Sequence, residues 1–329
     1  MTDLIKDENS QATMYTVASL YHFTRLTNLR KKQQELQSLC KSLEILGTLL
    51  LADEGLNGTI SGRAGAITCV LDFIHEWPEI DDLEIKYSES VDQSFKRLKV
   101  KIKKEIVTMG KPDVDVARDA GRYVKPTEWN ALISRDDVLV VDTRNTYEFG
   151  IGHFPNAIEP ETESFVDFPA WADQLSQERK RPKTVAMYCT GGIRCEKATA
   201  YMRELGFDEV YHLQGGILKY LEEVPEEESL WEGECFVFDG RVSLKHNLVE
   251  GTYELCYACQ QPISTEESSS PLFERGVSCP KCVDQVTEEK KQRFRERHRQ
   301  VLLSAERGEQ HIGDTAMAKK KSFRQRGKD

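Results

Sequence analysis

Apolar positions in the first third of the chain follow two spacings. Runs that are typical of strands cover residues 15–23, 44–52, 83–87 and 95–107. Apolar residues three and four positions apart are typical of amphipathic helices, and they cover residues 29–43 and 66–76. The stretch Gly55-Leu56-Asn57-Gly58 predicts a tight turn before a short strand at 59–61, with Asn57 as a turn residue. This β-α-β-β-α-β order with an extra strand predicts a ferredoxin-like α/β sandwich over residues 14–110.

A second alternation of strands and helices follows a stretch rich in Asp, Gly and Pro, residues 111–124, which we interpret as a linker. Thr127 is expected to cap a helix that contains Trp129. Short apolar runs predict buried strands at 138–141, 184–188 and 209–211, and helical spacing covers 168–178 and 195–205. This alternation predicts a doubly wound parallel sheet over residues 125–225.

The remaining third is more polar. An acidic connector leads into a cysteine-rich segment, residues 226–286, which is too short to build a large core of its own. A charged helix at 288–303 and a basic tail make up residues 287–329. Disorder is expected in the tail from about residue 307 and in the polar residues 1–13. The predicted fold class is α/β with a small C-terminal extension.

Charge and hydropathy limit the partners and the cellular compartment that we expect for this protein. The net charge of −10 argues against general nucleic-acid binding, but residues 286–329 carry +6 and the rest of the chain −16. Such a basic arm is either an RNA contact or a solvated tail. No apolar run approaches the length of a membrane span or a signal-peptide core. We therefore expect a cytoplasmic protein with no membrane partner, whose nine cysteines are reduced.

One cysteine occupies a loop suited to chemistry. Tyr188 ends an apolar strand, Cys189 follows at once, and a helix begins near Arg194. At this position Gly191 and Gly192 allow the backbone to turn its N–H groups inward, and the helix N-terminus and the arginine add positive potential. These groups favour a thiolate over a thiol, so the pKa of Cys189 should fall. The alternative is a buried structural cysteine, which the order of strand, glycines, arginine and helix disfavours.

The loop length separates two chemistries. Cysteine phosphatases use five residues between cysteine and arginine to hold phosphate, whereas four separate Cys189 from Arg194. The tighter loop favours a single sulfur or a smaller group. Cys195 is either a resolving thiol for an oxidised or persulfidated Cys189 or an inward-packed helix residue.

The sequence around this loop resembles the rhodanese family. The resemblance rests on Cys189-Thr190-Gly191-Gly192-Ile193-Arg194, on Asp142-Thr143-Arg144 with Glu148 and Gly152-His153, and on Gly206-Phe207 through Gln214-Gly215-Gly216. It implies a cysteine that carries a persulfide. Asp142, Arg144, Glu148 and His153 are expected to support the loop rather than to react.

Two flanking features are similar to one subgroup, the bacterial tRNA uridine(34) hydroxylases. They are residues 51–62, which include Asp53-Glu54-Gly55-Leu56-Asn57-Gly58, and the loop continuation Cys195-Glu196-Lys197-Ala198. The resemblance implies an acylphosphatase-like N-terminal domain, the anticodon arm of tRNA as partner, and molecular oxygen as co-substrate. The implied reaction gives 5-hydroxyuridine at the wobble position, with Cys189 as the essential residue. Two rivals remain: a sulfurtransferase that uses a Cys189 persulfide, and a non-catalytic tRNA-binding or redox-sensing module.

Two further clusters predict binding. On a strand, Arg97, Lys99, Lys101 and Lys103 share one face, which suits RNA phosphates or simple solvation. Cys256, Cys259, Cys279 and Cys282 form two Cys-x-x-Cys pairs, whose spacing predicts a closed structural zinc site rather than a catalytic one. Cys40, Cys69 and Cys235 are expected to be packing residues. The sequence contains no flavin, nicotinamide or haem motif, and it leaves the oligomeric state open.

Overall fold

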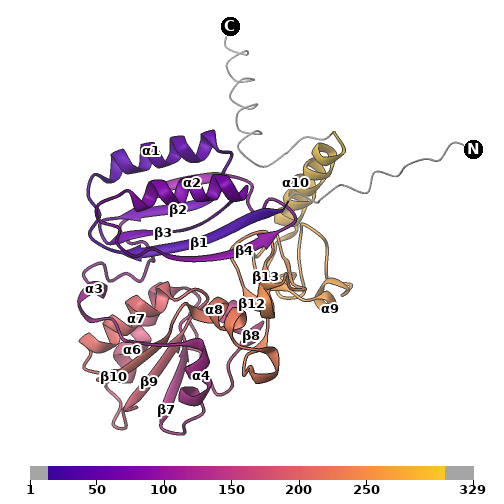
Figure 1. The fold of residues 1–329 in the computed structure, drawn as a ribbon. Coiled ribbons are helices and arrows are strands. Elements are labelled where there is room, and N and C mark those ends of the chain that lie inside the picture. The colour runs from indigo at the N-terminus through magenta and orange to yellow at the C-terminus, as the bar shows by residue number, and fades with distance from the viewer. Residues whose placement is uncertain (1–13, 308–329) are drawn as a thin grey trace, which may run out of the picture.

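The computed structural model describes residues 14–307, and its first domain is a five-stranded sheet covered on one face by two helices (Figure 1). Its elements are β1 (Tyr15–Phe23), α1 (Leu29–Ser42), β2 (Leu46–Ala52), β3 (Gly55–Gly62), α2 (Ala64–His75), β4 (Glu84–Ser90) and β5 (Leu98–Ile102). The strand order β4-β1-β3-β2-β5 confirms the ferredoxin-like arrangement, with β5 as the extra strand, parallel to β2 at one edge.

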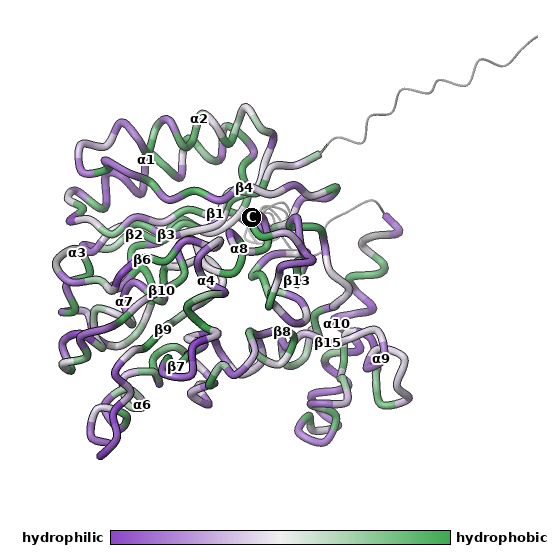
Figure 2. The backbone as a smooth tube through the Cα atoms, turned by 60° about the horizontal axis from the view of Figure 1, so that its bottom comes forward, coloured by the Kyte–Doolittle hydropathy of each residue, from purple (hydrophilic) through white to green (hydrophobic). Residues whose placement is uncertain are grey.

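Alternation along the strands divides the side chains of this sheet between two faces. Ala18 and Leu20 of β1 belong to the core beneath α1 and α2. Ser19 and Tyr21 therefore point to the opposite face, toward the second domain. Figure 2 shows the corresponding mixture of hydrophobic and hydrophilic residues along the two helices that cover the core. The face of the sheet beneath α1 and α2 carries the core of the first domain, and the opposite face is free to line a site.

The turn predicted at residues 55–58 is wrong. These residues lie in β3, the central strand, which pairs with β1 and β2 on its two sides. A Cβ atom on Gly58 would come within 2.2 Å of the Thr48 carbonyl oxygen, so the glycine serves close strand packing rather than a turn. Asn57 donates from Nδ2 to the carbonyl of Ile106 at 2.9 Å.

The second domain contains a four-stranded, wholly parallel sheet with the order β6-β10-β9-β7. Its elements are α3 (Val116–Asp119), β6 (Arg122–Val124), α4 (Pro126–Ile133), β7 (Val138–Asp142), α5 (Thr146–Phe149), β8 (Gly152–His153), η1 (Phe165–Asp167), α6 (Phe168–Ser176), β9 (Thr184–Tyr188), α7 (Ile193–Glu204), β10 (Glu209–Leu213) and α8 (Gly216–Glu223). One core lies toward α6 and α7 and the other toward α4 and α8, as a doubly wound sheet requires.

Two local expectations for this domain are corrected. Residues 122–124, expected in a linker, form β6, because pairing with β10 supplies hydrogen bonds that no local pattern reveals. Thr127 does not cap its helix: Lys125 is the N-cap and Pro126 occupies the first turn, where its missing N–H costs nothing.

The C-terminal segment lies beside both domains (Figure 1). It contains η2 (Glu226–Glu228), β11 (Glu232–Gly233), β12 (Cys235–Phe236), β13 (Ser243–Leu244), η3 (His246–Leu248), β14 (Glu254–Leu255), β15 (Pro262–Ile263), α9 (Thr265–Ser268) and α10 (Glu288–Glu306). Strand β11 pairs with β8 of the second domain, and Arg241 donates to Ser88 Oγ of the first at 2.7 Å. The segment thus joins the other two domains.

Three remaining expectations concern the ends, the membrane and the thiols. The disorder expected at residues 1–13 and in the tail from residue 308 lies outside the described residues. Among helices in residues 14–307, none has the length and apolar character needed to cross a membrane. Cys40 and Cys235 are buried packing residues, but Cys69 is exposed on α2, because it lies on the helix face turned away from the sheet.

Candidate active site

Cys189 lies at the carboxyl end of β9, at the centre of the parallel sheet. All five residues of β9 are buried, and α7 begins four residues after the cysteine. Two glycines shape the loop. Gly192 has a φ of 101°, and a Cβ on Gly216 would lie 2.5 Å from the Cys189 carbonyl oxygen. Local chain reversal and close approach of α8 therefore hold the cysteine in place.

The surroundings of Cys189 favour its thiolate. The N–H of Gly192 donates to Sγ at 3.1 Å. Burial alone would raise the pKa of Cys189, but the Cys195 thiol, the Arg194 charge and the N–H groups of Cys195 and Gly192 lower it to about 5. The thiolate is therefore the form present at neutral pH, and it is the nucleophilic form. A Cβ on Gly191 would meet open space, so no close contact explains this glycine, and its role as an N–H donor stays a prediction.

Arg194 acts on the thiolate from a fixed position. Its guanidinium binds Glu148 through two hydrogen bonds of 2.7 and 2.8 Å and reaches Thr190 Oγ1 at 3.2 Å. Glu148 is fully buried; burial opposes its charge, yet Arg194 holds the pKa of this carboxyl below its usual range. Glu148 thus positions Arg194, as expected of a supporting residue.

Cys195 is the second thiol of the site. It is fully buried, hydrogen-bonds to Cys189, and lies 3.4 Å from Thr143 Oγ1. Burial and the neighbouring Cys189 hold the pKa of Cys195 well above its ordinary range. The pair therefore combines one thiolate with one protonated thiol, which donates a hydrogen bond to it.

Alkylation should distinguish these two thiols. We expect the rate of Cys189 alkylation by iodoacetamide to rise through an inflection near pH 5 and to be constant at neutral pH, because the pKa of Cys189 is about 5. Cys195 should stay unmodified. Peptide mass spectrometry between pH 4 and pH 9 provides the measurement, with the exposed Cys69 as internal reference. An inflection near the free-thiol value of about 8.5 would contradict the described electrostatics.

A buried ion pair at the end of β7 supports the structure around the Cys189 loop. Asp142 and Arg144 are both fully buried and meet at 2.7 Å, and Arg144 also donates to the Gly152 carbonyl at 2.6 Å. The guanidinium lies against the rings of Tyr188 and Trp231. His153 stacks on Phe149, and its Nδ1 lies 3.1 Å from the carbonyl oxygen of Phe154. These residues hold the strand end rather than face the thiolate.

A cavity of about 450 Å³ opens above Cys189. Its floor is the loop from Cys189 to Arg194, and one wall is the free face of the first sheet, with Ser19, Tyr21 and Thr59. The other wall comes from the C-terminal segment and includes Phe238. The site thus lies where all three parts of the chain meet, and it has the size of a small-molecule site.

Several cavity residues carry no signal in the local sequence. Phe238 and Tyr87 line the cavity and are 62% and 52% exposed, which is unusual for large aromatic side chains. Lys86 also lines it, and burial lowers the pKa of this ammonium group. Only their shared proximity to Cys189 identifies them, because they lie about 50 to 100 residues from it in the sequence.

The basic strand lies beside this cavity. Lys99 and Lys101 of β5 are exposed and pair with Thr48 and Leu50 of β2, which line the cavity. Paired residues of neighbouring strands share a face. Lys103 is also exposed, whereas Arg97 is half-buried, and both lie just outside the strand. The sheet face that covers the thiolate therefore continues into a positive edge.

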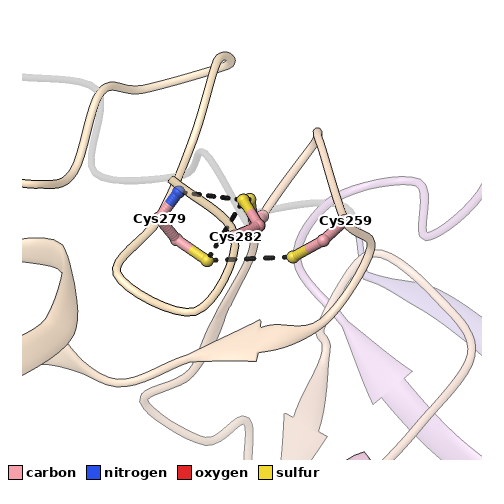
Figure 3. A group of neighbouring side chains, drawn as sticks. Cys259, Cys279 and Cys282 are labelled. Carbon is pink, nitrogen blue, oxygen red and sulfur yellow. Dashed lines mark hydrogen bonds between the residues drawn. The ribbon is translucent and has the colours of Figure 1, made fainter. Parts of the chain in front are cut away.

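The four clustered cysteines converge in the C-terminal segment, and Figure 3 shows three of them pointing toward one another. The Sγ–Sγ distances are 3.7 Å for Cys259–Cys279 and Cys279–Cys282 and 3.9 Å for Cys256–Cys282. Zinc–thiolate bonds of about 2.3 Å place sulfurs about 3.8 Å apart at the corners of a tetrahedron. The four sulfur donors and the distances between them fit a zinc ion. These cysteines lie far from the thiolate loop in the sequence.

Comparison with known families assigns the two larger domains. Residues 15–106 match the family described as the UPF0176 acylphosphatase-like domain, and residues 125–223 match the rhodanese-like domain. Together they cover more than half of the chain. The thiolate loop belongs to the second match, and the free sheet face belongs to the first.

Whole-chain relatives are also similar. A tRNA uridine(34) hydroxylase of Agrobacterium fabrum is 56% identical over 91% of this chain and 95% of its own length. The proteins of the same name from Rhizobium leguminosarum and Teredinibacter turnerae are each 54% identical, over 93% and 92% of this chain and 99% and 94% of their own lengths. The similarity therefore includes the cysteine-rich segment that neither domain match covers.

Proposed function

The chain belongs to the tRNA uridine(34) hydroxylase family, and from that premise we propose that Cys189 performs the family's reaction inside the cavity between the three parts of the chain. The reaction is hydroxylation of the uridine at tRNA position 34, the wobble position. The observation that carries the proposed role of Cys189 is the coincidence of a stabilised thiolate with a nucleoside-sized cavity.

The cavity suits a base that has left its stack. Bases in single-stranded loops are the ones that proteins read and stack on aromatic side chains. Phe238 of the C-terminal segment presents an exposed ring at this cavity. These features support an anticodon arm held across the cavity, with the wobble base turned toward Cys189.

The chemistry that we propose places a hydroxyl group on carbon 5 and gives 5-hydroxyuridine, with molecular oxygen as co-substrate. Two routes use the thiolate. Cys189 adds to the pyrimidine ring and activates carbon 5, or an oxygenated or persulfidated Cys189 delivers the oxygen atom. On either route, one oxygen atom enters the base and the other leaves as water, with two electrons supplied by an external thiol reductant. On the second route, Cys195 resolves an oxidised Cys189 as a disulfide, which that reductant then opens. We expect this chemistry in the cytoplasm.

Nucleoside mass spectrometry tests this function. Wobble-position nucleosides are compared between cells with and without the gene. Loss of 5-hydroxyuridine on deletion, restored by the wild-type gene, is the expected result. Loss of a thiolated base instead would identify a sulfurtransferase. No change in either nucleoside would exclude both the hydroxylase and the sulfurtransferase as activities on tRNA.

We expect the positive edge of the first sheet to bind tRNA phosphates. Replacing Lys99 and Lys101 together by glutamate should weaken tRNA binding by about tenfold or more and reduce the slope of log affinity against log salt by about two. Fluorescence anisotropy at several salt concentrations measures both. Lys31→Glu is the matched control, since Lys31 is exposed on α1, on the opposite side of the sheet. Equal losses in both variants would refute a local binding edge.

We propose that Cys256, Cys259, Cys279 and Cys282 hold a structural zinc ion. The described residues around them form only a small apolar core, so a metal would supply the stability that the segment lacks. Four thiolates leave no open position, which suits structure rather than catalysis. Metal analysis of purified protein should find about one zinc per chain, lost on Cys279→Ser. A content well below that value in the wild-type protein would overturn the assignment.

A further inference from the structure

A buried carboxyl group beside the thiolate loop has no role in the chemistry described so far. Glu196 follows Cys195 on α7 and is 7% exposed. Its neighbour Lys197 is also buried, and meets Glu54 and Glu105 at 2.7 and 2.8 Å. By contrast, Glu196 accepts a hydrogen bond from a neutral group, the Tyr21 hydroxyl, at 2.8 Å. Within residues 14–307, no cation pairs with it by direct contact. Burial without an ion-pair partner raises the pKa of a carboxyl group, so such a group holds a proton closer to neutral pH than an ion-paired one does.

Tyr21 connects this carboxyl group to the cavity. Its side chain lines the cavity from the free face of the first sheet. A Cβ on Gly192 would lie 2.8 Å from the Tyr21 hydroxyl oxygen, and the N–H of the same glycine donates to Cys189 Sγ. The hydroxyl therefore lies against the reactive loop on one side and Glu196 on the other.

Burial, opposed by neighbouring hydroxyl and ammonium groups, sets the titration of Glu196 near neutrality. Burial raises the pKa of Glu196 to about 7, and the carboxylate of Glu84 also acts to raise it. The hydroxyls of Tyr21 and Tyr123 and the ammonium of Lys86 act in the opposite direction. These groups come from three strands, β1, β4 and β6. Near pH 7 the carboxyl group is divided between its two forms, which suits a proton acceptor.

The proposed reaction requires such an acceptor. When oxygen has bonded to carbon 5, that carbon carries both the new oxygen and its original hydrogen. The ring double bond returns only when this hydrogen leaves as a proton and its bonding electrons form the carbon 5–carbon 6 bond. If Cys189 has added to carbon 6, the carbon–sulfur bond breaks in the same step and its electrons return to the thiolate. Cys189 itself, stabilised as a thiolate, is a poor base for this proton.

We propose that Tyr21 and Glu196 form the relay that removes this proton. The Tyr21 oxygen takes the proton from carbon 5 while the Tyr21 hydroxyl proton passes to a Glu196 carboxylate oxygen. The transfer needs no oxidant or reductant. This inference rests on the proposed hydroxylation at carbon 5 and adds the residues that complete it.

Single-turnover rates of 5-hydroxyuridine formation, measured from pH 5.5 to pH 9, test the relay. Glu196→Gln keeps the size and a hydrogen-bonding partner for Tyr21 but cannot accept the proton. We expect its rate to fall by about 100- to 10,000-fold and to lose the inflection near pH 7. Tyr21→Phe should fall similarly. Tyr123→Phe removes a hydrogen bond that lowers the Glu196 pKa, so its inflection should move to higher pH.

A deuterium label separates proton removal from a structural role. With tRNA that carries deuterium on carbon 5 of uridine 34, the variants Glu196→Gln and Tyr21→Phe should show a larger isotope effect than the wild type, because proton loss becomes the slow step. Their Cys189 alkylation profiles should match the wild type. A wild-type pH profile and isotope effect in both variants would overturn the relay, as would an alkylation shift that accounts for the whole loss. If wild-type protein forms no 5-hydroxyuridine, the proposed function itself fails.

Discussion

Cys189→Ser should abolish the modification, lowering the rate of 5-hydroxyuridine formation by at least about 1,000-fold. Serine keeps the approximate size of the side chain, but its hydroxyl group does not ionise near neutral pH. The thiolate that the loop stabilises, with its pKa of about 5, is therefore lost. Purified variant and unmodified tRNA, followed by nucleoside mass spectrometry, provide the measurement.

Two other cysteines serve as controls for this variant. Cys69→Ser changes an exposed thiol on α2 outside the cavity and should retain wild-type activity. Cys195→Ser should complete a first turnover and then stop if Cys195 resolves an oxidised Cys189. Full multiple-turnover modification by Cys189→Ser would refute its catalytic role.

Asp142→Asn should cause the largest loss of stability among single substitutions near the site. Asp142 and Arg144 are both fully buried, and the guanidinium would remain buried without a counter-charge. Breaking such a pair typically costs about 3–5 kcal/mol in the free energy of unfolding. A shift of the urea denaturation midpoint of the second domain provides the measurement.

An exposed pair supplies the matched control. Arg135 and Asp137 meet at the same 2.7 Å, but both side chains are largely in water. Asp137→Asn should leave the denaturation midpoint nearly unchanged, because water already screens this pair. Equal shifts for the two asparagine variants would show that burial does not govern the contribution of the Asp142–Arg144 pair.

Most elements of the fold could be predicted from the sequence. The strand at 15–23 and the helices near 29–43 and 66–76 have periodic apolar residues, because each buries one face. The strand at 184–188 is a short apolar run, because both of its faces are buried. Where the prediction was wrong, a partner strand outweighed the local signal. Glycines at 55 and 58 resemble a turn in isolation, but β1 and β2 press against them from both sides.

Part of the candidate site could likewise be predicted from the sequence. The loop from Cys189 to Arg194 is continuous in the chain, so its strand, glycines, arginine and helix N-terminus are visible together in the sequence. The clustering of the four cysteines is likewise predicted by their spacing, because two short pairs restrict where the sulfurs lie.

By itself, therefore, the sequence identified the candidate nucleophile, Cys189, together with the family resemblance and the order of the domains. Only the tertiary structure decided what surrounds the thiolate. Tyr21 comes from β1, Lys86 from β4 and Phe238 from the C-terminal segment, and each meets Cys189 at one cavity. The physical reason is that a local pattern reports which face of an element is buried, whereas the packing of three parts of the chain against one another decides which residues line the same cavity.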